Sequence, residues 1–485
     1  MRGKGRSLLG AGASLVILGG TVVASGDAKA GLTTCDVAPS GAPYGTIDAA
    51  IQDSGCDVIR VAPGTYLERL LIQRSVELRG AGPDRTIVDG EDGGSVVTTS
   101  CGSDEILIDG FTLQQGAAPT GGGIENCAVL TIADSRITSN TATNGQGGGI
   151  DNDGELTIRM STIAGNRASG PSGAGGGIFN RGRLDLAAVT LASNSAGFRS
   201  GGVHVQGGFV STMDAVTISG NAAKDAGGAI VVAGGAELRI SNSTIAGNEV
   251  DGGSGAGAIW GVGTVQVRSS IVAGPNADCA GSIESRGHNL DSDGSCFRGG
   301  RTDLRDTAPR LAPLADNGGP VRTRALEQDS PAIDGASPDG VHCGGTDARG
   351  VPRPSRARCD IGSYERAACS GITIDHVGTP VDDRLVGTGE RDGFLALGGD
   401  DLLQGGSGED GLCAGEGDDA VNGGAGDDAS RGGPGNDHLL GGKGNDLLRG
   451  EEGRDRIDGG LNMDRCYGGP GPDRIVNCAR QRAGR

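Results

Sequence analysis

Aspartate recurs at every ninth position across the last quarter of this 485-residue chain. Each aspartate follows a glycine-rich stretch, as in the block GGKGNDLLR that begins at Gly441. Glycine lets the backbone take positive φ angles and approach an ion closely, and calcium prefers carboxylate and carbonyl oxygens. The pattern therefore predicts a stack of calcium sites, with Ca2+ as the cofactor. The eleven positions are Asp383, Asp392, Asp401, Asp410, Asp419, Asp428, Asp437, Asp446, Asp455, Asp464 and Asp473.

A mostly apolar residue stands two places after each aspartate. Nine of these eleven residues are plainly apolar, and the exceptions are Ser430 and Cys466. One buried side chain in every nine residues fits a very short strand between turns, repeated as one stacked unit. The alternative is an acidic, disordered tail, but such tails do not keep an apolar residue in strict phase with an acid.

The segment from Gly378 to Val476 resembles the haemolysin-type (RTX) calcium-binding repeats. This resemblance implies a parallel β-roll that holds calcium between successive turns. Two early blocks, GTPVDDRLV and GTGERDGFL, lack glycine at the fourth place, and the block GGLNMDRCY has Asn462 there. We therefore leave Asp383, Asp392 and Asp464 out of the predicted set. The predicted calcium ligands are Asp401, Asp410, Asp419, Asp428, Asp437, Asp446, Asp455 and Asp473.

The charge of this segment predicts that calcium is needed for folding. Residues 378–476 contain 21 acidic and 9 basic residues, a net charge of −12. Like charges on adjacent turns repel, and the segment has few apolar side chains to offset that repulsion. We therefore expect it to be largely unfolded without calcium and to fold as the ion binds.

Composition and the first residues predict an exported protein. The chain has 96 glycines and 2% aromatic residues, which suits a repeat solenoid, and its net charge of −19 excludes a nucleic-acid partner. Residues 1–30 have the basic start, apolar stretch and Ala-Lys-Ala end of a signal peptide, the alternative being an uncleaved membrane anchor. No second apolar stretch follows, so we expect no transmembrane segment in the mature chain.

Twelve cysteines in an exported chain favour disulfides over free thiols. Neighbouring cysteines suggest the pairs Cys35–Cys56, Cys101–Cys127, Cys279–Cys296, Cys343–Cys359, Cys369–Cys413 and Cys466–Cys478.

A longer repeat precedes the aspartate blocks. The string GGGI recurs at residues 121–124, 147–150 and 175–178, and short apolar runs follow each copy. An apolar residue then recurs at spacings of 26 to 28, at Ile137, Ile163, Leu191, Ile218, Ile245 and Ile271. Three short runs per period predict one coil of a right-handed parallel β-helix, so the fold class is all-β. A structural ladder of stacked side-chain amides is expected at Asn140, Asn166, Asn194, Asn221 and Asn248.

These longer repeats resemble those of polymorphic outer-membrane proteins. The start of the repeat region, residues 44–82, looks like that of many secreted β-helix proteins, which implies a short capping helix near Ile47 to Gln52. Residues 269–365, with TDARGVPRP and CDIGSYE, resemble the choice-of-anchor Q region of bacterial surface proteins. The expected organisation is a signal peptide (1–30), a β-helix with its cap (31–275), a choice-of-anchor Q-like end (276–368), and the calcium-binding roll with its tail (369–485).

An enzyme is the main rival interpretation, because alginate C-5 epimerases pair a β-helix with RTX-like modules. Pectate lyases and polygalacturonases are also β-helices, but the epimerase-type string Y-G-x-D-P-H is absent here. Glu125 and Asp151 follow GGGI in adjacent coils and are the best acidic candidates. Solvated surface acids, with no accompanying Lys or Arg, are the simpler interpretation. His204 is expected to be a wall or surface residue, and we assign no catalytic residue.

The sequence thus favours a non-enzymatic adhesion or display protein at the cell surface or in the extracellular space. Its expected partners are calcium and either extracellular glycans or cell-surface proteins. A secreted lyase, hydrolase or epimerase that acts on acidic polysaccharides is the alternative. A structural surface-layer component is a third possibility.

Overall fold

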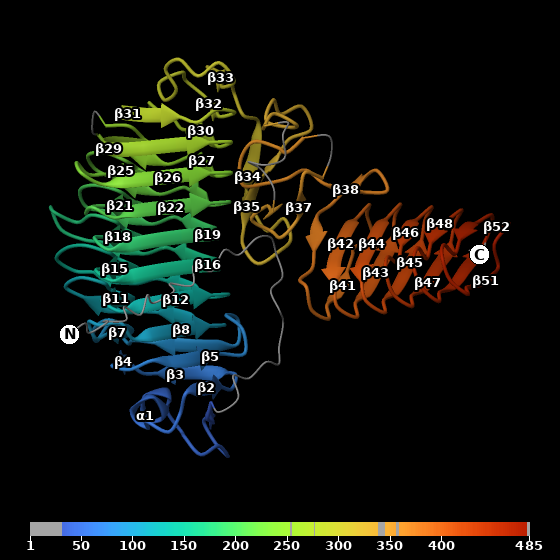
Figure 1. The fold of residues 1–485 in the computed structure, drawn as a ribbon, viewed down its shortest axis with the longest axis horizontal. Helices are drawn as coiled ribbons and strands as arrows, with labels where there is room; N and C mark the ends of the chain where they lie inside the picture. The colour runs from blue at the N-terminus through green and yellow to red at the C-terminus, as the bar shows by residue number, and fades with distance from the viewer. Residues whose placement is uncertain (1–31, 253–254, 276, 338–344, 356–357, 483–485) are drawn as a thin grey trace, which may run out of the picture.

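The computed structural model describes residues 32–252, 255–275, 277–337, 345–355 and 358–482. It contains a long stack of parallel strands followed by a smaller parallel roll that projects from the side of the stack (Figure 1). The predicted all-β fold class is therefore confirmed. The predicted signal peptide lies outside the described residues. Among those residues, no helix has the length and apolar character that crossing a membrane requires.

Three faces of parallel strands form the β-helix. The first face contains β4 (Leu70–Ile72), β7 (Val97–Thr99), β11 (Ile124–Asn126), β15 (Ile150–Asn152), β18 (Ile178–Asn180), β21 (Val203–Val205) and β25 (Ile230–Val232). The second contains β1 (Thr34–Val37), β2 (Val58–Val61), β5 (Val76–Arg79), β8 (Glu105–Asp109), β12 (Val129–Ala133), β22 (Val210–Asp214) and β26 (Glu237–Ser241). The third contains β3 (Gly64–Leu67), β6 (Thr86–Asp89), β9 (Thr112–Gln114), β13 (Arg136–Thr138), β23 (Thr217–Ser219), β27 (Thr244–Ala246), β30 (Ile271–Ala273), β32 (Leu290–Asp291) and β33 (Leu304–Arg305).

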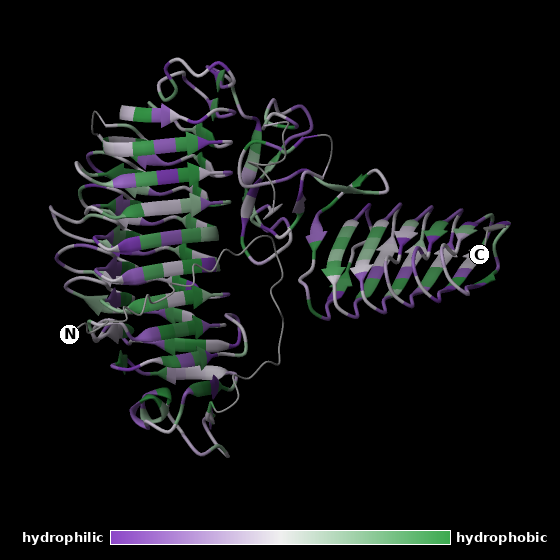
Figure 2. Cartoon of the chain, in the orientation of Figure 1, coloured by the Kyte–Doolittle hydropathy of each residue, from purple (hydrophilic) through white to green (hydrophobic). Residues whose placement is uncertain are grey.

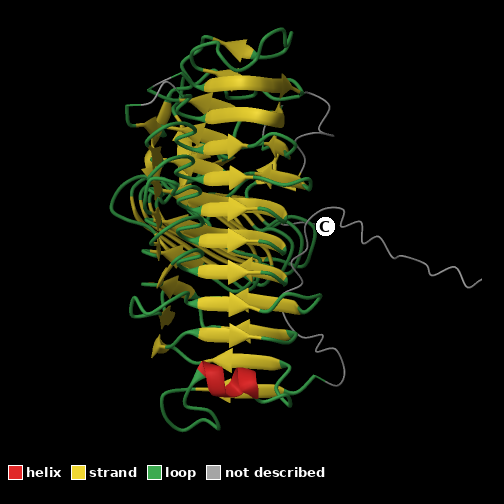
Figure 3. Cartoon of the chain, turned by 90° about the vertical axis from the view of Figure 1, so that its left-hand side faces the viewer, coloured by secondary structure: helices red, strands yellow, loops and turns green. Residues whose placement is uncertain are grey.

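Four longer strands pass from one face to the next. β16 (Glu155–Ala164) and β19 (Arg183–Ala192) join the second and third faces, and β29 (Ile259–Arg268) and β31 (Cys279–Ser285) join the first and second. A separate row of two-residue strands lies beside the third face: β10 (Ala117–Ala118), β14 (Thr141–Ala142), β17 (Arg167–Ala168), β20 (Ser195–Ala196), β24 (Ala222–Ala223) and β28 (Glu249–Val250). Figure 3 shows the strands of successive coils lying one above another.

The interior of the β-helix is filled by columns of aliphatic side chains. Ile137, Ile163, Leu191, Ile218 and Ile245 are fully buried and pair in register through five coils. The predicted sixth member is wrong by one residue. Ile245 pairs with Val272, whereas Ile271 pairs with Thr244. Both Ile271 and Val272 are buried, so the hydrophobic pattern alone could not distinguish them.

The predicted asparagine ladder is confirmed. The side-chain nitrogen of Asn140 donates to Oδ1 of Asn166 at 3.0 Å, and the same bond repeats down to Asn248. A second, shorter ladder was not predicted. It runs from Asn126 through Asn152 to Asn180, with bonds of 2.7 and 2.5 Å. These side chains are buried and give the turns of the solenoid their hydrogen-bond partners.

The predicted cap is also present. Helix α1 (Ile47–Gln52) covers one end of the β-helix and buries Ile47, Ala50 and Ile51 (Figures 1 and 3). Thr46 caps its N-terminus, and the carboxylate of Glu68 accepts the backbone N–H groups of Ile47 and Asp48. This arrangement covers the open hydrophobic end of the stack.

After β33 the chain returns along the side of the β-helix. It forms short antiparallel pairs from β34 (Leu311–Ala315) and β35 (Thr323–Leu326), β36 (Gly345–Thr346) and β37 (Pro352–Arg353), and β38 (Ala368–Cys369) and β39 (Ile372–Thr373). The Ser363 hydroxyl lies 2.7 Å from that of Thr217, and the Ser363 amide donates to Thr244, so this segment docks on the third face. A fully buried Arg349 pairs with Asp347 at 2.9 Å and lies over the ring of Tyr364.

The roll is built from two parallel sheets. One contains β40 (His376–Val377), β42 (Gly393–Gly398), β44 (Gly411–Glu416), β46 (Ala429–Arg431), β48 (Leu447–Arg449), β50 (Arg465–Tyr467) and β52 (Arg480–Arg482). The other contains β41 (Arg384–Val386), β43 (Leu402–Ser407), β45 (Ala420–Ala425), β47 (His438–Lys443), β49 (Arg456–Leu461) and β51 (Arg474–Val476). Leu403 pairs with Val421, so one coil takes 18 residues, or two blocks of nine.

The predicted apolar series lines the interior of the roll. From Phe394 to Cys466 every member is buried, including Ser430, whereas Leu385 and Ile475 at the two ends are partly exposed. Hydrophilic turns connect these strands (Figure 2). The interior is therefore one side chain deep on each sheet, and it offers little apolar burial to hold the coils together.

Five of the six predicted disulfides are present. They are Cys35–Cys56, Cys101–Cys127, Cys279–Cys296, Cys369–Cys413 and Cys466–Cys478. Cys343 of the sixth pair lies outside the described residues. The Cys369–Cys413 bond joins β38 to β44 and ties the roll to the segment that docks on the β-helix.

Candidate calcium site

The aspartates of the roll form two ladders, one along each row of turns. The Oδ1 atom of Asp428 accepts the backbone N–H of Asp410 at 2.9 Å, and Asp410 in turn accepts that of Asp392 at 2.8 Å. Asp419 and Asp437 make the same bonds in the other row, to the N–H groups of Asp401 and Asp419. Each bond spans 18 residues, so the nine-residue period alternates between the two rows.

The second carboxylate oxygen has no such partner. In eight of these residues Oδ2 is buried and, within the described chain, receives no hydrogen bond. The side chains themselves are at most 2% exposed. A buried, unpaired carboxylate oxygen is costly unless a cation meets it. The eight are Asp401, Asp410, Asp419, Asp428, Asp437, Asp446, Asp455 and Asp464.

Backbone carbonyls converge on the same places. A Cβ added to Gly405 would lie 2.5 Å from Oδ2 of Asp410 and 2.4 Å from the carbonyl oxygen of Gly423 in the next coil. Gly441 has the same surroundings, with Oδ2 of Asp446 and the carbonyl of Gly459 both at 2.4 Å. The two nearest atoms at each of these glycines are a carboxylate oxygen and a carbonyl oxygen, which belong to the donor set that calcium prefers.

The backbone at the fourth place of the block favours glycine. Gly426 has a φ of 144°, and a Cβ on it would lie 1.6 Å from the carbonyl oxygen of Gly408. Asn462 occupies this place in the block that ends before Gly468 and takes a φ of 90°. Asparagine tolerates positive φ better than most residues. Asp464 of the same block is fully buried and accepts the Asp446 amide at 2.9 Å, so its geometry equals that of its neighbours.

Burial and like charges raise the pKa of seven of these carboxyls, at Asp401, Asp410, Asp419, Asp428, Asp437, Asp446 and Asp455. Burial, with the neighbouring carboxylates Asp446 and Asp410 as a further cause, raises the pKa of Asp428 to about 7. Burial likewise raises the pKa of Asp401 and Asp437 to about 7. The ladder N–H groups oppose this shift but do not cancel it. The arrangement stores uncompensated negative charge that a divalent cation would neutralise.

In the two early blocks, the Oδ2 atom of the aspartate does receive hydrogen bonds. Thr388 donates its backbone N–H at 2.6 Å and its hydroxyl at 3.0 Å to Oδ2 of Asp392. Thr379 donates both groups to Oδ2 of Asp383 in the same way. A threonine at the second place of the block therefore adds a hydroxyl donor that glycine at this place lacks. Asp473, at the other end, is half-buried, and its Oδ1 accepts the Asp455 amide at 3.2 Å.

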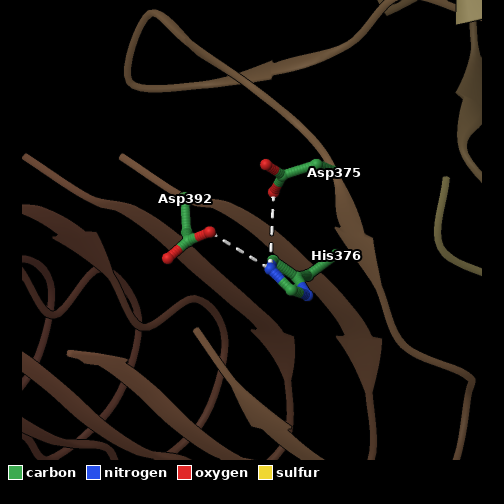
Figure 4. A group of neighbouring side chains, drawn as sticks. All are labelled: Asp375, His376 and Asp392. Atoms are coloured by element: carbon green, nitrogen blue, oxygen red, sulfur yellow. Dashed lines mark hydrogen bonds and ion pairs between the residues drawn. The ribbon is translucent and has the colours of Figure 1, made fainter. Parts of the chain in front are cut away.

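His376 closes one ladder at its first coil. Its Nε2 lies 3.4 Å from Oδ1 of Asp392 and 3.8 Å from Oδ1 of Asp375 (Figure 4). Its ring stacks on Phe394 at 4.6 Å between centroids. Asp392 Oδ1 is the atom that would accept an N–H from a preceding coil, and His376 takes that position. No sequence motif pointed to this residue.

Besides the two buried ladders, the roll has a ladder on its surface, which was not predicted from the sequence. Oδ1 of Asp418 accepts the Asn436 amide at 2.8 Å, and Oδ1 of Asp400 accepts the Asp418 amide at 2.9 Å. These side chains are exposed. The frequent Asp or Asn directly before each ladder aspartate was the available signal.

The acidic pair considered as an enzyme candidate has a different environment from the one expected. Glu125 and Asp151 do pair in register on adjacent strands. However, the expectation of solvated acids without a basic partner is wrong for Asp151. This residue is 4% exposed, and Arg181 pairs with it at 3.0 Å while also bonding Asp153 and Gln146. Sequence reasoning missed Arg181 because it follows the strand of the next coil.

His204 is a wall residue, as expected. Its ring stacks on Phe179 at 4.8 Å, and burial lowers its pKa to about 4. A neutral imidazole packed against an aromatic ring explains this residue structurally.

Comparison with known proteins agrees with the geometry of the roll. A family model described as the RTX calcium-binding nonapeptide repeat matches residues 377–412, 396–429, 412–439, 431–462 and 440–475. The C-terminal repeats are therefore RTX repeats, and calcium is their cofactor. The buried, unpaired Oδ2 atoms and the converging carbonyls fit that ion.

The comparison with solved structures says less about the β-helix than the family match says about the roll. The chain is similar to the solved structure of the PL6 family alginate lyase AlyGC, at 10% identity over 90% of this chain and 74% of that chain, with a TM-score of 0.20. A likeness of this strength carries no argument about activity. A search of curated proteins returned no match.

Proposed function

We propose that this chain is an exported, calcium-binding protein whose roll folds when the ion binds. The observation that carries the proposal is the row of buried Oδ2 atoms without donors. The proposed ligands are the eight predicted aspartates, Asp401 to Asp455 at nine-residue steps and Asp473, together with Asp464. Carbonyl oxygens of the glycine-rich turns would complete each coordination shell.

Export is supported by the chemistry of the cysteines. Five disulfides lie within the described residues, and such bonds persist in oxidising compartments. Extracellular calcium modules work at ion concentrations of roughly 10⁻⁴ to 10⁻³ M. A roll with a net charge of −12 would stay unfolded where calcium is scarce and would fold outside the cell.

We infer a non-enzymatic role in adhesion or display. Arg181 pairs with Asp151, the better-buried member of the acidic pair, so of the two only the exposed Glu125 has no cationic partner among the described residues. The β-helix would then act as a rigid platform, and the roll would fold on calcium binding after export. The test is a calcium titration by calorimetry and circular dichroism, with a parallel assay for binding and cleavage of acidic polysaccharides. Calcium uptake with a gain of β-structure and no cleavage is expected, whereas cleavage would favour an enzyme.

A second candidate is the binding of acidic glycans on the second face. Arg239, Arg268 and Arg286 line an open depression of about 470 Å³. Arg239 and Arg286 pair with Glu237 and Glu284, but Arg268 has no ion-pair partner among the described residues. Arginine is suited to planar carboxylates such as those of uronic acids.

The Arg268→Gln variant tests this candidate, with Arg159→Gln on the same face as the matched control. Loss of binding to an acidic oligosaccharide in the first variant alone would support it. Equal binding by both variants would exclude this depression as the site.

A further inference from the structure

Three carboxylates meet at the last coil of the β-helix, at the end opposite α1 (Figure 1). Asp278 directly precedes β31, Asp291 ends β32, and Asp293 lies in the turn that follows. One oxygen from each residue lies within 4.8 Å of the others. This cluster has no part in the roll and belongs to no nonapeptide block.

Two of these carboxylates are buried with an unpaired oxygen. Asp278 and Asp291 are both 0% exposed. Oδ2 of Asp278 accepts the amide and hydroxyl of Ser292, and Oδ2 of Asp291 accepts the amides of Cys296 and Phe297. The Oδ1 atom of each residue receives no hydrogen bond from the described chain. Hydrogen bonds therefore fix both carboxylates while leaving one oxygen of each available.

Asp293 completes the group from the solvent side. Its Oδ2 accepts the Asp278 amide at 3.1 Å, and its Oδ1 accepts the Ser295 amide at 2.9 Å. The side chain is exposed, so water can reach the cluster and fill remaining coordination positions. The Cys279–Cys296 disulfide joins the residue after Asp278 to the residue after Ser295 and holds the two segments together.

No cationic side chain in the described part of the chain offsets this charge. Among the described residues, no Lys, Arg or His forms an ion pair with any of the three carboxylates. The guanidinium of Arg305 donates to the carbonyl of Gly294, next to Asp293, at 3.2 Å, and forms no ion pair with the cluster. Burial, and then the neighbouring carboxylates, raise the pKa of Asp278 to about 7, which reflects the same unbalanced charge. Isolated buried carboxylates are costly unless they coordinate a metal or share a proton.

We propose that Asp278, Asp291 and Asp293 form a second calcium site, which closes the C-terminal end of the β-helix. The all-oxygen donor set selects a hard cation over zinc or copper. The exposed third carboxylate allows the water-completed, irregular coordination that calcium accepts and magnesium tolerates less well. This site is independent of the roll, so it goes beyond the function proposed above.

The test is hydrogen exchange of the full-length protein, followed by mass spectrometry with and without calcium. At about ten times the dissociation constant, calcium should slow the opening of residues 277–297 about tenfold. Asp278→Asn and Asp291→Asn should abolish this local protection while the roll peptides still respond. These amides keep the hydrogen-bonding shape and remove charge, so the variants should fold. Asp306→Asn, at an exposed aspartate nearby, is the matched control.

A second readout uses the only tryptophan of the chain. Trp260 pairs in register with Ala280, two residues after Asp278. Terbium bound in place of calcium should therefore give tryptophan-sensitised emission that both variants lose and the control keeps.

The outcomes separate this site from the roll. If roll peptides respond to calcium and residues 277–297 do not, the second site is refuted and the roll proposal stands. If lowering the pH in calcium-free buffer protects residues 277–297 from exchange and adding calcium does not, a shared proton occupies the cluster and the inference is wrong. Retention of the calcium response in both variants would also overturn it.

Discussion

Asp428 accepts the backbone N–H of Asp410 through Oδ1 at 2.9 Å, while its Oδ2 is buried without a donor. The two oxygens of one carboxylate thus have separate tasks. The first holds adjacent coils in register, and the second is available to an ion between them. A disordered acidic tail would not hold the two oxygens of a carboxylate in such different environments.

The neighbouring residues Asp427 and Asp428 allow a matched test of this division. Asp428→Asn keeps an acceptor for the Asp410 amide but removes the charge, so the midpoint of calcium-induced folding should rise about tenfold, or about 1.4 kcal/mol. Asp427 is exposed and accepts the Asn445 amide at 2.7 Å. Asp427→Asn should leave the midpoint nearly unchanged. Equal shifts in the two variants, measured by circular dichroism, would contradict the assignment.

The pH dependence of the calcium-free roll follows from its raised pKa values. In the folded state the pKa of Asp401, Asp428 and Asp437 is about 7, compared with about 3.9 for an unfolded aspartate. Protonation therefore favours the folded form, and this stabilisation is complete below about pH 4 and is lost as the pH rises through about 7. The calcium-free segment should gain β-structure on acidification. A signal that does not change between about pH 8 and about pH 4 would refute this electrostatic account.

Both repeats could be predicted from the sequence because each repeat unit stacks on copies of itself. Any residue type fixed at one phase must then form a column, as Asn140 to Asn248 and Phe394 to Cys466 do. The helix Ile47–Gln52 was also predictable, because the resemblance covered its residues.

Features that depend on neighbouring coils could not be predicted. Asp151 is neutralised by Arg181, which is 30 residues away in sequence but in the next coil in space. The partner of Ile245 is Val272 and not the predicted Ile271, and the sequence pattern could not separate these two adjacent apolar residues. The donors that Thr388 supplies to Asp392 likewise became visible only in the structure.

The asparagine ladder should contribute measurably to the stability of the β-helix. Asn194 accepts from Asn166 and donates to the carbonyl of Ile163 and to Asn221. Asn194→Ala leaves these buried groups without partners and should cost about 3 kcal/mol. Asn144→Ala, at an exposed turn, should change stability by less than about 0.5 kcal/mol. Chemical denaturation measures both, and a small effect at Asn194 would show that the ladder is dispensable.

The segment docked on the third face depends on a buried charge pair. Arg349 bonds Asp347 and the backbone carbonyl of Glu365 and is fully buried. Arg349→Met leaves the Asp347 carboxylate buried without its cation and should destabilise the protein by about 3–5 kcal/mol. Arg301→Met, at an exposed arginine, serves as the control. Thermal unfolding curves that coincide for the two variants would mean that this pair does not hold the segment in place.

The most direct test of the account is the removal of calcium from the full-length protein. Circular dichroism and limited proteolysis should be followed before and after chelation, with calcium then restored. We expect residues 378–476 to lose β-structure and become sensitive to protease, while the β-helix stays intact, and we expect calcium to reverse the change. A roll that keeps its β-structure and its protease resistance without calcium would contradict the central claim.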